Sequence, residues 1–165
     1  MEILIIALIC YCMGSIPFGF LLTKIFLKKD IRKIGSGNIG ATNALRTGNK
    51  FLGYSTLILD ILKAVIPILI IKIYYSEYIF LSSLSVFLGH LFPVWLNFKG
   101  GKGVATYIGI LFCINYILGL IFITTWLIIF LISKYSSLSS LMASFIIPIY
   151  HFFIIENGNY YFFII

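Results

Sequence analysis

The first 26 residues, MEILIIALICYCMGSIPFGFLLTKIF, contain the apolar stretch that decides the fold class. Residues 3–22 are mostly apolar, and a helix of about 20 such residues spans the hydrocarbon core of a bilayer. Glu2 occupies the region where a secretory signal peptide has basic residues, and the apolar run exceeds the core of such a peptide. We therefore expect a retained first transmembrane helix, and Pro17 with its small neighbours predicts a kink or an unwound turn in its second half.

The composition of the whole chain also indicates a membrane protein. Of the 165 residues, 61% are hydrophobic and 10% are charged, and the mean hydropathy is +1.10, whereas about a quarter of the residues of a soluble domain are charged. The net charge is +7, but the basic residues form short clusters between apolar runs. This pattern is typical of membrane topology and argues against a nucleic-acid partner.

Further apolar segments follow along the chain. We expect spans at residues 51–74, 79–96 and 138–155. Residues 104–132 form either two short tilted helices or one long helix. A last apolar run begins at residue 160 and stops at residue 165, so we expect an incomplete final span. The prediction is an all-α polytopic bundle of about seven spans, which forms one domain over residues 1–165.

The positions of lysine and arginine predict the orientation of the chain. Seven basic residues lie between Lys24 and Lys50, two more are Lys99 and Lys102, and another is Lys134. Because basic residues favour the cytoplasmic side, we expect the N-terminus outside and all three clusters inside. This orientation requires residues 104–132 to cross twice, which favours two short helices.

The first polar stretch, SGNIGATNALR at residues 36–46, is one of two glycine-rich segments between the apolar runs. Ser36, Asn38, Thr42 and Asn43 supply hydrogen-bonding groups, and Arg46 has a planar guanidinium that can hold a phosphate through two bonds. These residue types are also common in ordinary loops. The stretch is therefore compatible with a phosphate site and with a plain basic loop.

The second polar stretch, NFKGGKGVAT at residues 97–106, precedes an apolar helix. Consecutive backbone N–H groups of Gly100, Gly101 and Gly103 can form an anion-binding nest, and the helix N-terminus adds partial positive charge. Lys99 and Lys102 add full charges. Two such segments on one membrane face predict a phosphate site at the lipid boundary, although ordinary basic loops remain the alternative.

A few ionisable residues lie inside the predicted spans. His90 lies near the inner end of the third span, where it is either a structural residue or a catalytic one. Asp60 and Lys63 lie three residues apart on one helix face, so they can neutralise each other. A packing role for this pair is at least as compatible with the sequence as a catalytic role.

Several common catalytic and cofactor motifs are missing from the sequence. There is no GxSxG nucleophile elbow, no HxxxxD acid–base pair and no GxxxxGK[ST] phosphate-binding loop. The three cysteines lie in apolar segments, and no second Cys/His pair completes a metal site. We therefore expect no metal, no cofactor and no covalent acyl-enzyme.

Three motifs taken together resemble the bacterial acyl-phosphate:glycerol-3-phosphate acyltransferase family. They are GSIPFGFLLTK leading into GSGNIGATNALRTGNK, then GHLFPVWLNFKGGKGVAT, then SKYSSLSSL, from Gly14 to about Leu141. The resemblance implies a multi-pass protein of the bacterial inner membrane with its motifs on the cytoplasmic side. It implies transfer of a fatty acyl group from acyl-phosphate to the 1-hydroxyl of glycerol 3-phosphate, which gives lysophosphatidic acid and inorganic phosphate without a metal.

The resemblance also implies roles for individual residues. It implies that Ser36, Arg46 and Lys102 bind phosphate, and that Asn38, Thr42 and Asn43 shape the loop and donate hydrogen bonds. It implies that Gly100, Gly101 and Gly103 hold the oxygens of acyl-phosphate. Ser137 and Ser140 would close the glycerol-phosphate site. His90 matches the family's GH position and is one candidate for the proton acceptor. The other candidate is a substrate phosphate, whose second pKa is about 6.

The sequence departs from the family pattern at its end. The family continues through a last span to a basic cytoplasmic tail, whose histidine and asparagine lie near the glycerol-phosphate site. This sequence stops at YYFFII and lacks those residues. We expect a shortened or incomplete chain.

Two other functions fit the composition. A small anion transporter also uses broken helices whose N-termini face a phosphate, but the sequence has no inverted repeat. A non-catalytic protein that binds anionic lipid needs lysine and arginine but not an ordered glycine, asparagine and threonine set. We expect a monomer in contact with the bilayer.

Overall fold

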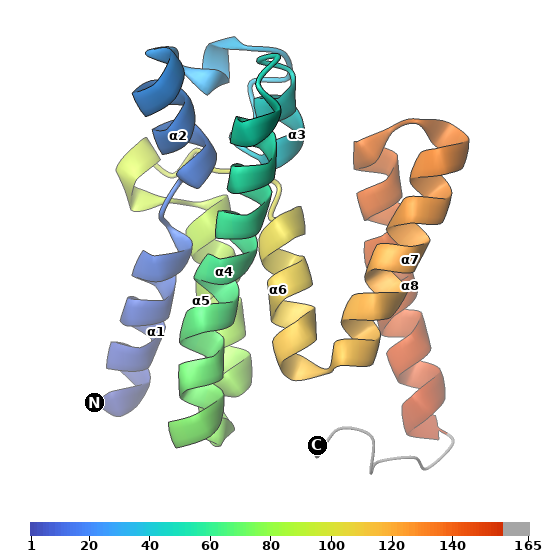
Figure 1. The fold of residues 1–165 in the computed structure, drawn as a ribbon. Helices are drawn as coiled ribbons and strands as arrows, with labels where there is room; N and C mark the ends of the chain where they lie inside the picture. Colours follow the sequence, from blue (N-terminus) through green and yellow to red (C-terminus); the bar gives the residue numbers. More distant parts are fainter. Residues whose placement is uncertain (157–165) are drawn as a thin grey trace. The chain divides into compact units, whose positions relative to one another are not determined.

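A computed structural model describes residues 1–156 of the chain, together with the side chains of residues 1–153 (Figure 1). These residues form α-helices and short 3-10 turns, with no strand among them. The predicted all-α fold class is therefore confirmed. The apolar run that begins at residue 160, on which the incomplete final span depends, lies outside the described residues.

Candidate membrane spans are identified by length and apolar composition. The described part of the chain has four, Glu2–Leu27, Ser76–Leu96, Tyr116–Ser133 and Ser136–Phe153, and Val104–Ile114 is a shorter apolar helix. The predicted span at residues 51–74 corresponds to α4, Lys50–Tyr74, which is long enough to cross but contains charged residues. Both the count of about seven spans and the outside N-terminus stay predictions.

The chain divides into two compact units. The N-terminal unit is Met1–Ile110 and the C-terminal unit is Leu111–Ile165. Each unit is described by itself, and the expected single domain stays a prediction.

The first apolar segment is broken, as the proline predicts. Helix α1 covers Glu2–Gly14 and α2 covers Phe18–Leu27, with Pro17 at the N-cap of α2. Proline fits a helix start because it has no N–H to lose there. The break lies between the two helices rather than inside one kinked helix.

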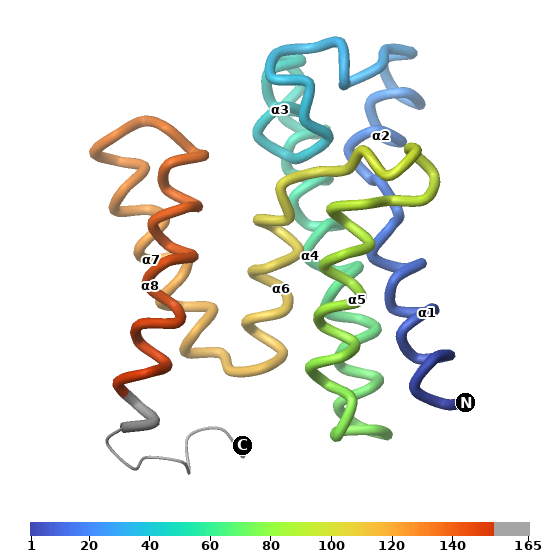
Figure 2. The backbone as a smooth tube through the Cα atoms, turned by 180° about the vertical axis from the view of Figure 1, so that it is seen from behind, coloured from blue at the N-terminus to red at the C-terminus, as the bar shows by residue number. Residues whose placement is uncertain are grey.

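Helices α1, α4 and α5 lie side by side in the N-terminal unit (Figure 2). Helix α5 covers Ile79–Leu91 after a 3-10 turn, η2, at Ser76–Tyr78. A Cβ at Gly14 would contact the backbone of Val86, and a Cβ at Gly89 would contact the carbonyl of Tyr11. Glycines on both helices thus allow the close backbone approach that packs α1 on α5.

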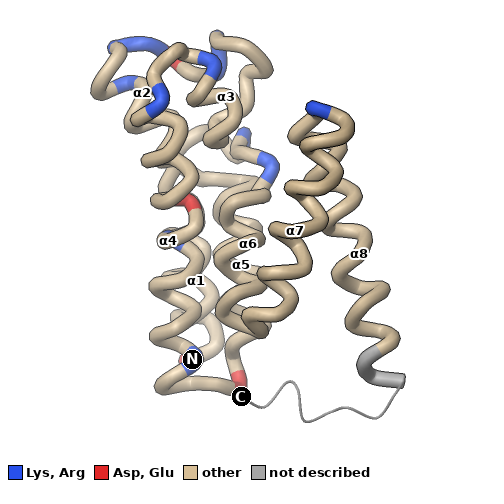
Figure 3. The backbone as a smooth tube through the Cα atoms, turned by 45° about the vertical axis from the view of Figure 1, so that its right-hand side comes forward, with Lys and Arg blue, Asp and Glu red and all other residues tan. Residues whose placement is uncertain are grey.

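The two polar stretches emerge at the same end of the N-terminal unit, away from the N-terminus (Figure 1). The first contains α3, Ala41–Leu45, and follows a 3-10 turn, η1, at Ile31–Lys33. The second follows the 3-10 turn η3, Val94–Leu96, and leads into α6, Val104–Ile114. Figure 3 shows that lysine and arginine of this unit gather around α2, α3 and the start of α6.

The C-terminal unit contains a pair of packed helices. Helix α7 covers Tyr116–Ser133 and α8 covers Ser136–Glu156. Residues 104–132 therefore form two helices, and the single long helix is excluded. The break falls at Asn115, whose side-chain oxygen accepts a hydrogen bond of 2.8 Å from the N–H of Ile117 and so caps α7.

Candidate phosphate-binding site

The two polar stretches rest on one shared apolar core. Its buried members come from η1, the first polar stretch, α4 and η3: Ile31, Ile39, Ala44, Leu52 and Leu96. Apolar side chains of α2 pack against the same cluster. Burial of these side chains removes apolar area from water and holds both stretches against the helices below. The first stretch contributes Ile39 and Ala44 to this core and the second begins directly after Leu96, so one core anchors both predicted parts of the phosphate site.

Asn43 organises the first polar stretch. It is 2% exposed, and its Nδ2 donates to the carbonyls of Ile31, Ile34 and Asn38 at 3.1, 2.9 and 2.8 Å. Its Oδ1 accepts from the N–H of Ser36 at 3.0 Å. Because the NH2 group has two hydrogens, one of them is shared between two of the three carbonyls, and these contacts tie the backbone of residues 31–38 to α3. The side chain therefore holds the loop in its conformation and is fully occupied in doing so.

Asn38 and Thr42 lie on either side of the start of α3. Oδ1 of Asn38 accepts from the N–H of Gly40 at 2.9 Å, which closes the turn before the helix. Thr42 lies on the exposed side of α3. This stretch also meets α2, because a Cβ at Gly19 would contact the carbonyl of Ile39.

Arg46 is an exposed cation at the end of α3. The Arg46 side chain passes close to Gly35, whose φ is +53°. A Cβ built at Gly35 would lie only 2.9 Å from Cδ of Arg46. Glycine therefore suits this position both by its backbone and by the space it leaves. Within the described part of the chain, the Arg46 guanidinium has no hydrogen bond or ion pair. Ser36 is also exposed, with its hydroxyl outside the hydrogen bonds of the loop.

Arg32 contrasts with Arg46, because its charge is already neutralised. Its guanidinium donates to both carboxylate oxygens of Asp30, with distances of 3.0 Å and 2.8 Å for the two shortest bonds. Asp30 also accepts from the N–H of Arg32 and caps η1. The side-chain hydrogen bonds from Arg32 lower the pKa of Asp30 to about 2. Arg32 is therefore a structural cation of the loop.

The second polar stretch is fastened to the end of α5. The N–H of Gly100 donates to the carbonyl of Leu91 and the N–H of Gly101 to the carbonyl of His90, both at 3.1 Å. These two amides are therefore not free anion donors in this conformation, which corrects the expected nest. The N–H groups of Lys102 and Gly103 donate to no group among the described residues, and they directly precede α6. The partial positive charge of a helix N-terminus favours an anion at this place.

Close packing accounts for the glycines themselves. A Cβ at Gly101 would meet the imidazole Nε2 of His90, and one at Gly100 would meet the carbonyls of α5. At Gly103, where φ is +77°, a Cβ would lie 2.5 Å from the ring of Phe87. Lys99 and Lys102 are exposed, and neither forms an ion pair within the described chain. The stretch thus presents two cations on a tightly packed backbone.

A buried polar cluster lies among the helices of the N-terminal unit. Asp60, Lys63 and His90 are 2%, 3% and 3% exposed. Nζ of Lys63 lies 2.9 Å from Oδ1 of Asp60, which confirms the predicted pairing of these residues. Nδ1 of His90 lies 3.9 Å from the same oxygen. Because His90 is buried beneath Gly101, a role as catalytic base stays a prediction.

Sequence reasoning missed the small hydroxyl groups around this cluster. The hydroxyl of Thr106 donates to the carbonyl of Asp60 at 3.3 Å, and the side chains of Ser15 and Thr56 are fully buried. The phenol of Tyr11 donates to the carbonyl of Phe92 at 2.6 Å, near the end of α5. Hydroxyl residues inside otherwise apolar segments are the signal that could have identified them.

Ser137 and Ser140 belong to the C-terminal unit. Ser137 is exposed, and the hydroxyl of Ser140 donates to the carbonyls of Ser136 and Ser137 at 3.1 and 3.0 Å. These bonds lie within α8. Participation of the two serines in the phosphate site stays a prediction.

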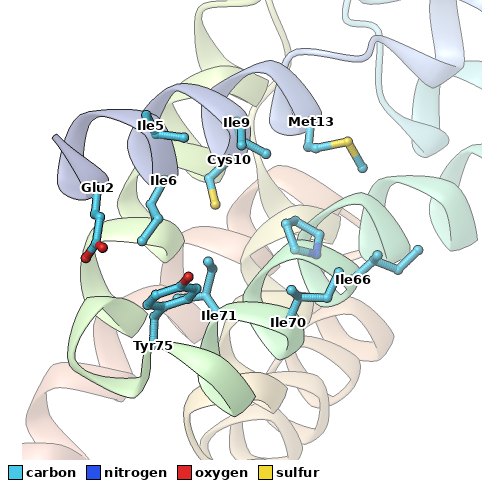
Figure 4. Close-up of a pocket in the computed structure, with 11 residues that line it drawn as sticks. Glu2, Ile5, Ile6, Ile9, Cys10, Met13, Ile66, Ile70, Ile71 and Tyr75 are labelled. Carbon is cyan, nitrogen blue, oxygen red and sulfur yellow. The ribbon is translucent and has the colours of Figure 1, made fainter.

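An apolar cavity of about 440 Å³ lies between α1 and α4 (Figure 4). Its lining runs from Glu2 to Met13 on α1 and from Ile66 to Ile71 on α4, and it includes Tyr75 directly after α4. These residues lie at the end of the N-terminal unit away from the polar stretches (Figure 1). The cavity is therefore separate from the candidate phosphate site. No group of three metal-binding side chains occurs among the described residues.

Helices of this length and composition, joined by basic loops, define an integral membrane protein. The family model described as glycerol-3-phosphate acyltransferase matches residues 4–165. The chain therefore belongs to the glycerol-3-phosphate acyltransferase family. This membership makes it a membrane acyltransferase of phospholipid synthesis and confirms the resemblance that the motifs indicated.

Individual relatives agree with the family assignment. A glycerol-3-phosphate acyltransferase of Pelagibacter ubique is 70% identical over 165 residues, which cover 100% of this chain and 86% of that protein. One from Bartonella henselae is 55% identical over 154 residues, which cover 90% of this chain and 73% of that protein.

Two crystal structures of PlsY (YgiH), an integral membrane glycerol 3-phosphate acyltransferase, have similar folds. The glycerol 3-phosphate form has a TM-score of 0.86 and 38% identity, and it covers 92% of this chain and 77% of that chain. The lysophosphatidic acid form has a TM-score of 0.83 and the same identity, with 92% and 76% covered.

Proposed function

We propose that this protein transfers a fatty acyl group from acyl-phosphate to the 1-hydroxyl of glycerol 3-phosphate. The hydroxyl oxygen attacks the acyl carbon, the bond from that carbon to the phosphate oxygen breaks, and the hydroxyl proton is passed to an acceptor. The products are lysophosphatidic acid and inorganic phosphate. The solved PlsY structures, in glycerol 3-phosphate and lysophosphatidic acid forms, support this choice of substrate and product.

The observation that carries the proposal is the anchoring of both polar stretches to one apolar core. Arg46 on one stretch and Lys102 on the other are exposed cations that form no ion pair within the described chain. Both proposed substrates bear a phosphate, and such cations bind phosphate through charge-assisted hydrogen bonds. A site at this end of the unit would meet one soluble substrate and one with an apolar tail.

The chemistry requires little beyond positioning. Acyl-phosphate is a mixed anhydride with a good leaving group, so direct attack by the hydroxyl needs no acyl-enzyme. Orientation of two reactants can lower a barrier by about 7–11 kcal/mol. Cations aimed at the leaving phosphate stabilise the charge that develops there.

Two proton acceptors are compatible with the proposal. A substrate phosphate, with a second pKa of about 6, would lie next to the hydroxyl. His90 is the other candidate base. Its burial and the close approach of Gly101 to Nε2 favour the substrate phosphate, because a base must reach the proton that it removes.

The proposed substrate-binding set is Ser36, Asn38, Thr42, Arg46, Lys99, Lys102, Gly103, Ser137 and Ser140. Asn43, Gly100 and Gly101, which were also predicted to bind substrate, instead shape the two stretches through the hydrogen bonds that they already form. The basic clusters support an orientation with these motifs facing the cytoplasm of a bacterial cell, in its inner membrane. We propose that the protein acts there as a monomer and without a metal.

A two-substrate assay tests this function. Purified protein in detergent micelles is given acyl-phosphate and glycerol 3-phosphate, and phosphate release and lysophosphatidic acid are both measured. We expect equal amounts of the two products, each dependent on both substrates. Arg46→Ala and Lys102→Ala should lower kcat/KM at least tenfold, the scale for one charge-assisted hydrogen bond.

Lys29→Ala is the matched control for these variants. Lys29 is an exposed cation outside both polar stretches, so its loss removes the same charge and should leave the rate nearly unchanged. Phosphate release without glycerol 3-phosphate would contradict the proposal. Uptake of glycerol 3-phosphate into liposomes without product formation would instead support an anion transporter.

A further inference from the structure

The buried cluster of Asp60, Lys63 and His90 has no place in the proposed chemistry. Ionisable side chains inside apolar helices are costly and tend to have a function. The cluster lies beneath the second polar stretch, since His90 contacts Gly101 from the α5 side. The contacts of its members with backbone groups indicate what it does.

One end of the cluster holds the break between α1 and α2. Nζ of Lys63 donates to the carbonyl of Ile16 at 2.7 Å, and Ile16 lies in the three-residue break. A carbonyl released from a helix in an apolar environment needs a donor. Lys63 supplies the shorter of two hydrogen bonds to this oxygen, the other coming from the N–H of Phe18 at 3.2 Å, and Asp60 neutralises the lysine at 2.9 Å.

The other end holds the second polar stretch. The imidazole Nδ1 of His90 faces Asp60 at 3.9 Å and has no hydrogen-bond partner among the described residues. Its Nε2 would contact a Cβ at residue 101, and its carbonyl accepts from the N–H of Gly101 at 3.1 Å. Both the imidazole and the backbone of His90 thus determine where Gly101 lies, one residue before Lys102.

A third contact joins the cluster to the start of α6. The hydroxyl of Thr106 donates to the carbonyl of Asp60 at 3.3 Å. Residues on both sides of Lys102 are therefore fixed to the same buried group of side chains and backbone. Because Gly101 and Thr106 are both fixed in this way, the intervening Lys102 can be held in one position relative to a bound phosphate.

We propose that Asp60, Lys63 and His90 are positioning residues that set the conformation of the second polar stretch, and with it the place of Lys102. The inference rests on the proposed function, because Lys102 is assigned there to phosphate binding. His90 acts in this account through its contact with Gly101 and transfers no proton.

Two variants of His90 separate positioning from the alternatives. His90→Gln keeps a polar group near the place of Nε2, the atom that contacts Gly101, whereas His90→Leu removes it. We expect His90→Leu to raise the KM for glycerol 3-phosphate or acyl-phosphate by about tenfold, and His90→Gln to recover most of that loss. Kinetic constants are normalised to folded protein, as judged by thermal unfolding in detergent.

Two results would overturn the inference. Loss of kcat by 10²-fold or more in both variants, with KM unchanged, would make His90 a catalytic base. Normal kcat and KM in both variants, whatever their unfolding temperature, would make the cluster purely structural.

A double-mutant cycle tests the contact with Gly101 directly. Gly101→Ala should weaken substrate binding because the new methyl group meets the imidazole of His90. In Gly101→Ala/His90→Ala that obstacle is gone, so the double variant should be no worse than His90→Ala alone. Multiplicative losses in the double variant would contradict the inference.

Gly100 provides a matched control in the same stretch. A Cβ there meets the carbonyls of His90 and Leu91, which are backbone atoms. His90→Ala should therefore give no relief to Gly100→Ala. If the wild-type protein releases no phosphate, the proposed function itself fails; if it is active and Gly101→Ala is equally harmful with and without the imidazole, only the positioning role fails.

Discussion

Nζ of Lys63 lies 2.9 Å from Oδ1 of Asp60 and 2.7 Å from the carbonyl oxygen of Ile16. Lys63 of α4 thereby neutralises Asp60 of the same helix and donates to a backbone carbonyl in the break between α1 and α2. The break brings α2, with Gly19 on it, against the first polar stretch. A charged pair inside an apolar bundle is in this way part of the scaffold on which the phosphate site is built.

Breaking this pair should harm stability more than removing both charges. Asp60→Asn leaves the Lys63 ammonium buried without its counter-charge, a change that costs about 3–5 kcal/mol in proteins. Asp60→Leu/Lys63→Met removes both charges and one of the two donors to the Ile16 carbonyl, which keeps the N–H of Phe18 at 3.2 Å, at a cost of about 0.5–1.5 kcal/mol. Thermal unfolding in detergent should rank wild type first, the double variant second and Asp60→Asn last. An Asp60→Asn protein as stable as wild type would show that the pair contributes nothing.

Asn43→Asp should be as damaging as Asn43→Ala. The aspartate can still accept from Ser36, but it loses the amide that donates to three carbonyls. With a net value of about 1 kcal/mol per hydrogen bond, we expect fast hydrogen exchange across residues 31–43 and at least a tenfold loss of activity. Asn38→Ala, which removes one turn bond, is the control for the hydrogen-exchange measurement. Slow exchange in Asn43→Asp would refute the organising role of the amide.

Gly19→Ala should loosen the first polar stretch from α2. Its Cβ would contact the carbonyl of Ile39 and lie 3.0 Å from the methyl group of Thr56. Gly48→Ala is the matched control, since φ is +84° there and nothing lies within 4 Å of the new Cβ. We expect the control to lose only about 1–2 kcal/mol of backbone energy, and Gly19→Ala to unfold at a clearly lower temperature. Equal unfolding temperatures would contradict the close packing of α2.

Arg46→Lys should not restore the activity that Arg46→Ala loses. Lysine keeps the charge but not the planar pair of donors that matches a phosphate. We expect the KM for the substrate that Arg46 binds to stay roughly tenfold above that of wild type, with kcat less affected. A wild-type KM in Arg46→Lys would show that only the positive charge of Arg46 is needed, and not its planar pair of donors.

The Asp30–Arg32 pair should make a small, acid-sensitive contribution to stability. Because the pKa of Asp30 is lowered to about 2 in the folded protein, from about 3.9 in an unfolded chain, its contribution is full above about pH 4 and is lost as the pH falls toward 2. Exposed pairs are worth about 0–1 kcal/mol. The difference in unfolding temperature between wild type and Asp30→Asn should therefore narrow over that acid range. A difference that widens on acidification would contradict the pairing.

The helical breaks show how far the sequence predicts the fold. Pro17 cannot continue a helix without losing a hydrogen bond, so the break between α1 and α2 is predictable from a local rule. For residues 104–132 the sequence left two short helices and one long helix as alternatives. The structure shows a break at Asn115, whose side chain caps α7.

The candidate site was predictable in its residue types and less so in its contacts. Glycines around Lys102 suggested free amides, yet Gly100 and Gly101 donate to α5 carbonyls. That outcome depends on how α5 ends, which is a tertiary property that loop composition does not contain. In the same way, Asn43 looks like an exposed loop amide in the sequence and is buried because η1 folds over it.

Thiol labelling tests the central claim most directly, namely that both polar stretches face one compartment and form one phosphate site. Ser36→Cys and Phe98→Cys place a thiol at an exposed position on each stretch, and a membrane-impermeant maleimide is applied to sealed vesicles of known orientation. Labelling of the native Cys10, Cys12 and Cys113 is subtracted with the parent protein. The account predicts that both thiols react only from the cytoplasmic side, and that glycerol 3-phosphate slows the reaction at Ser36→Cys. Reaction of the two thiols from opposite sides, or no protection by glycerol 3-phosphate, would contradict it.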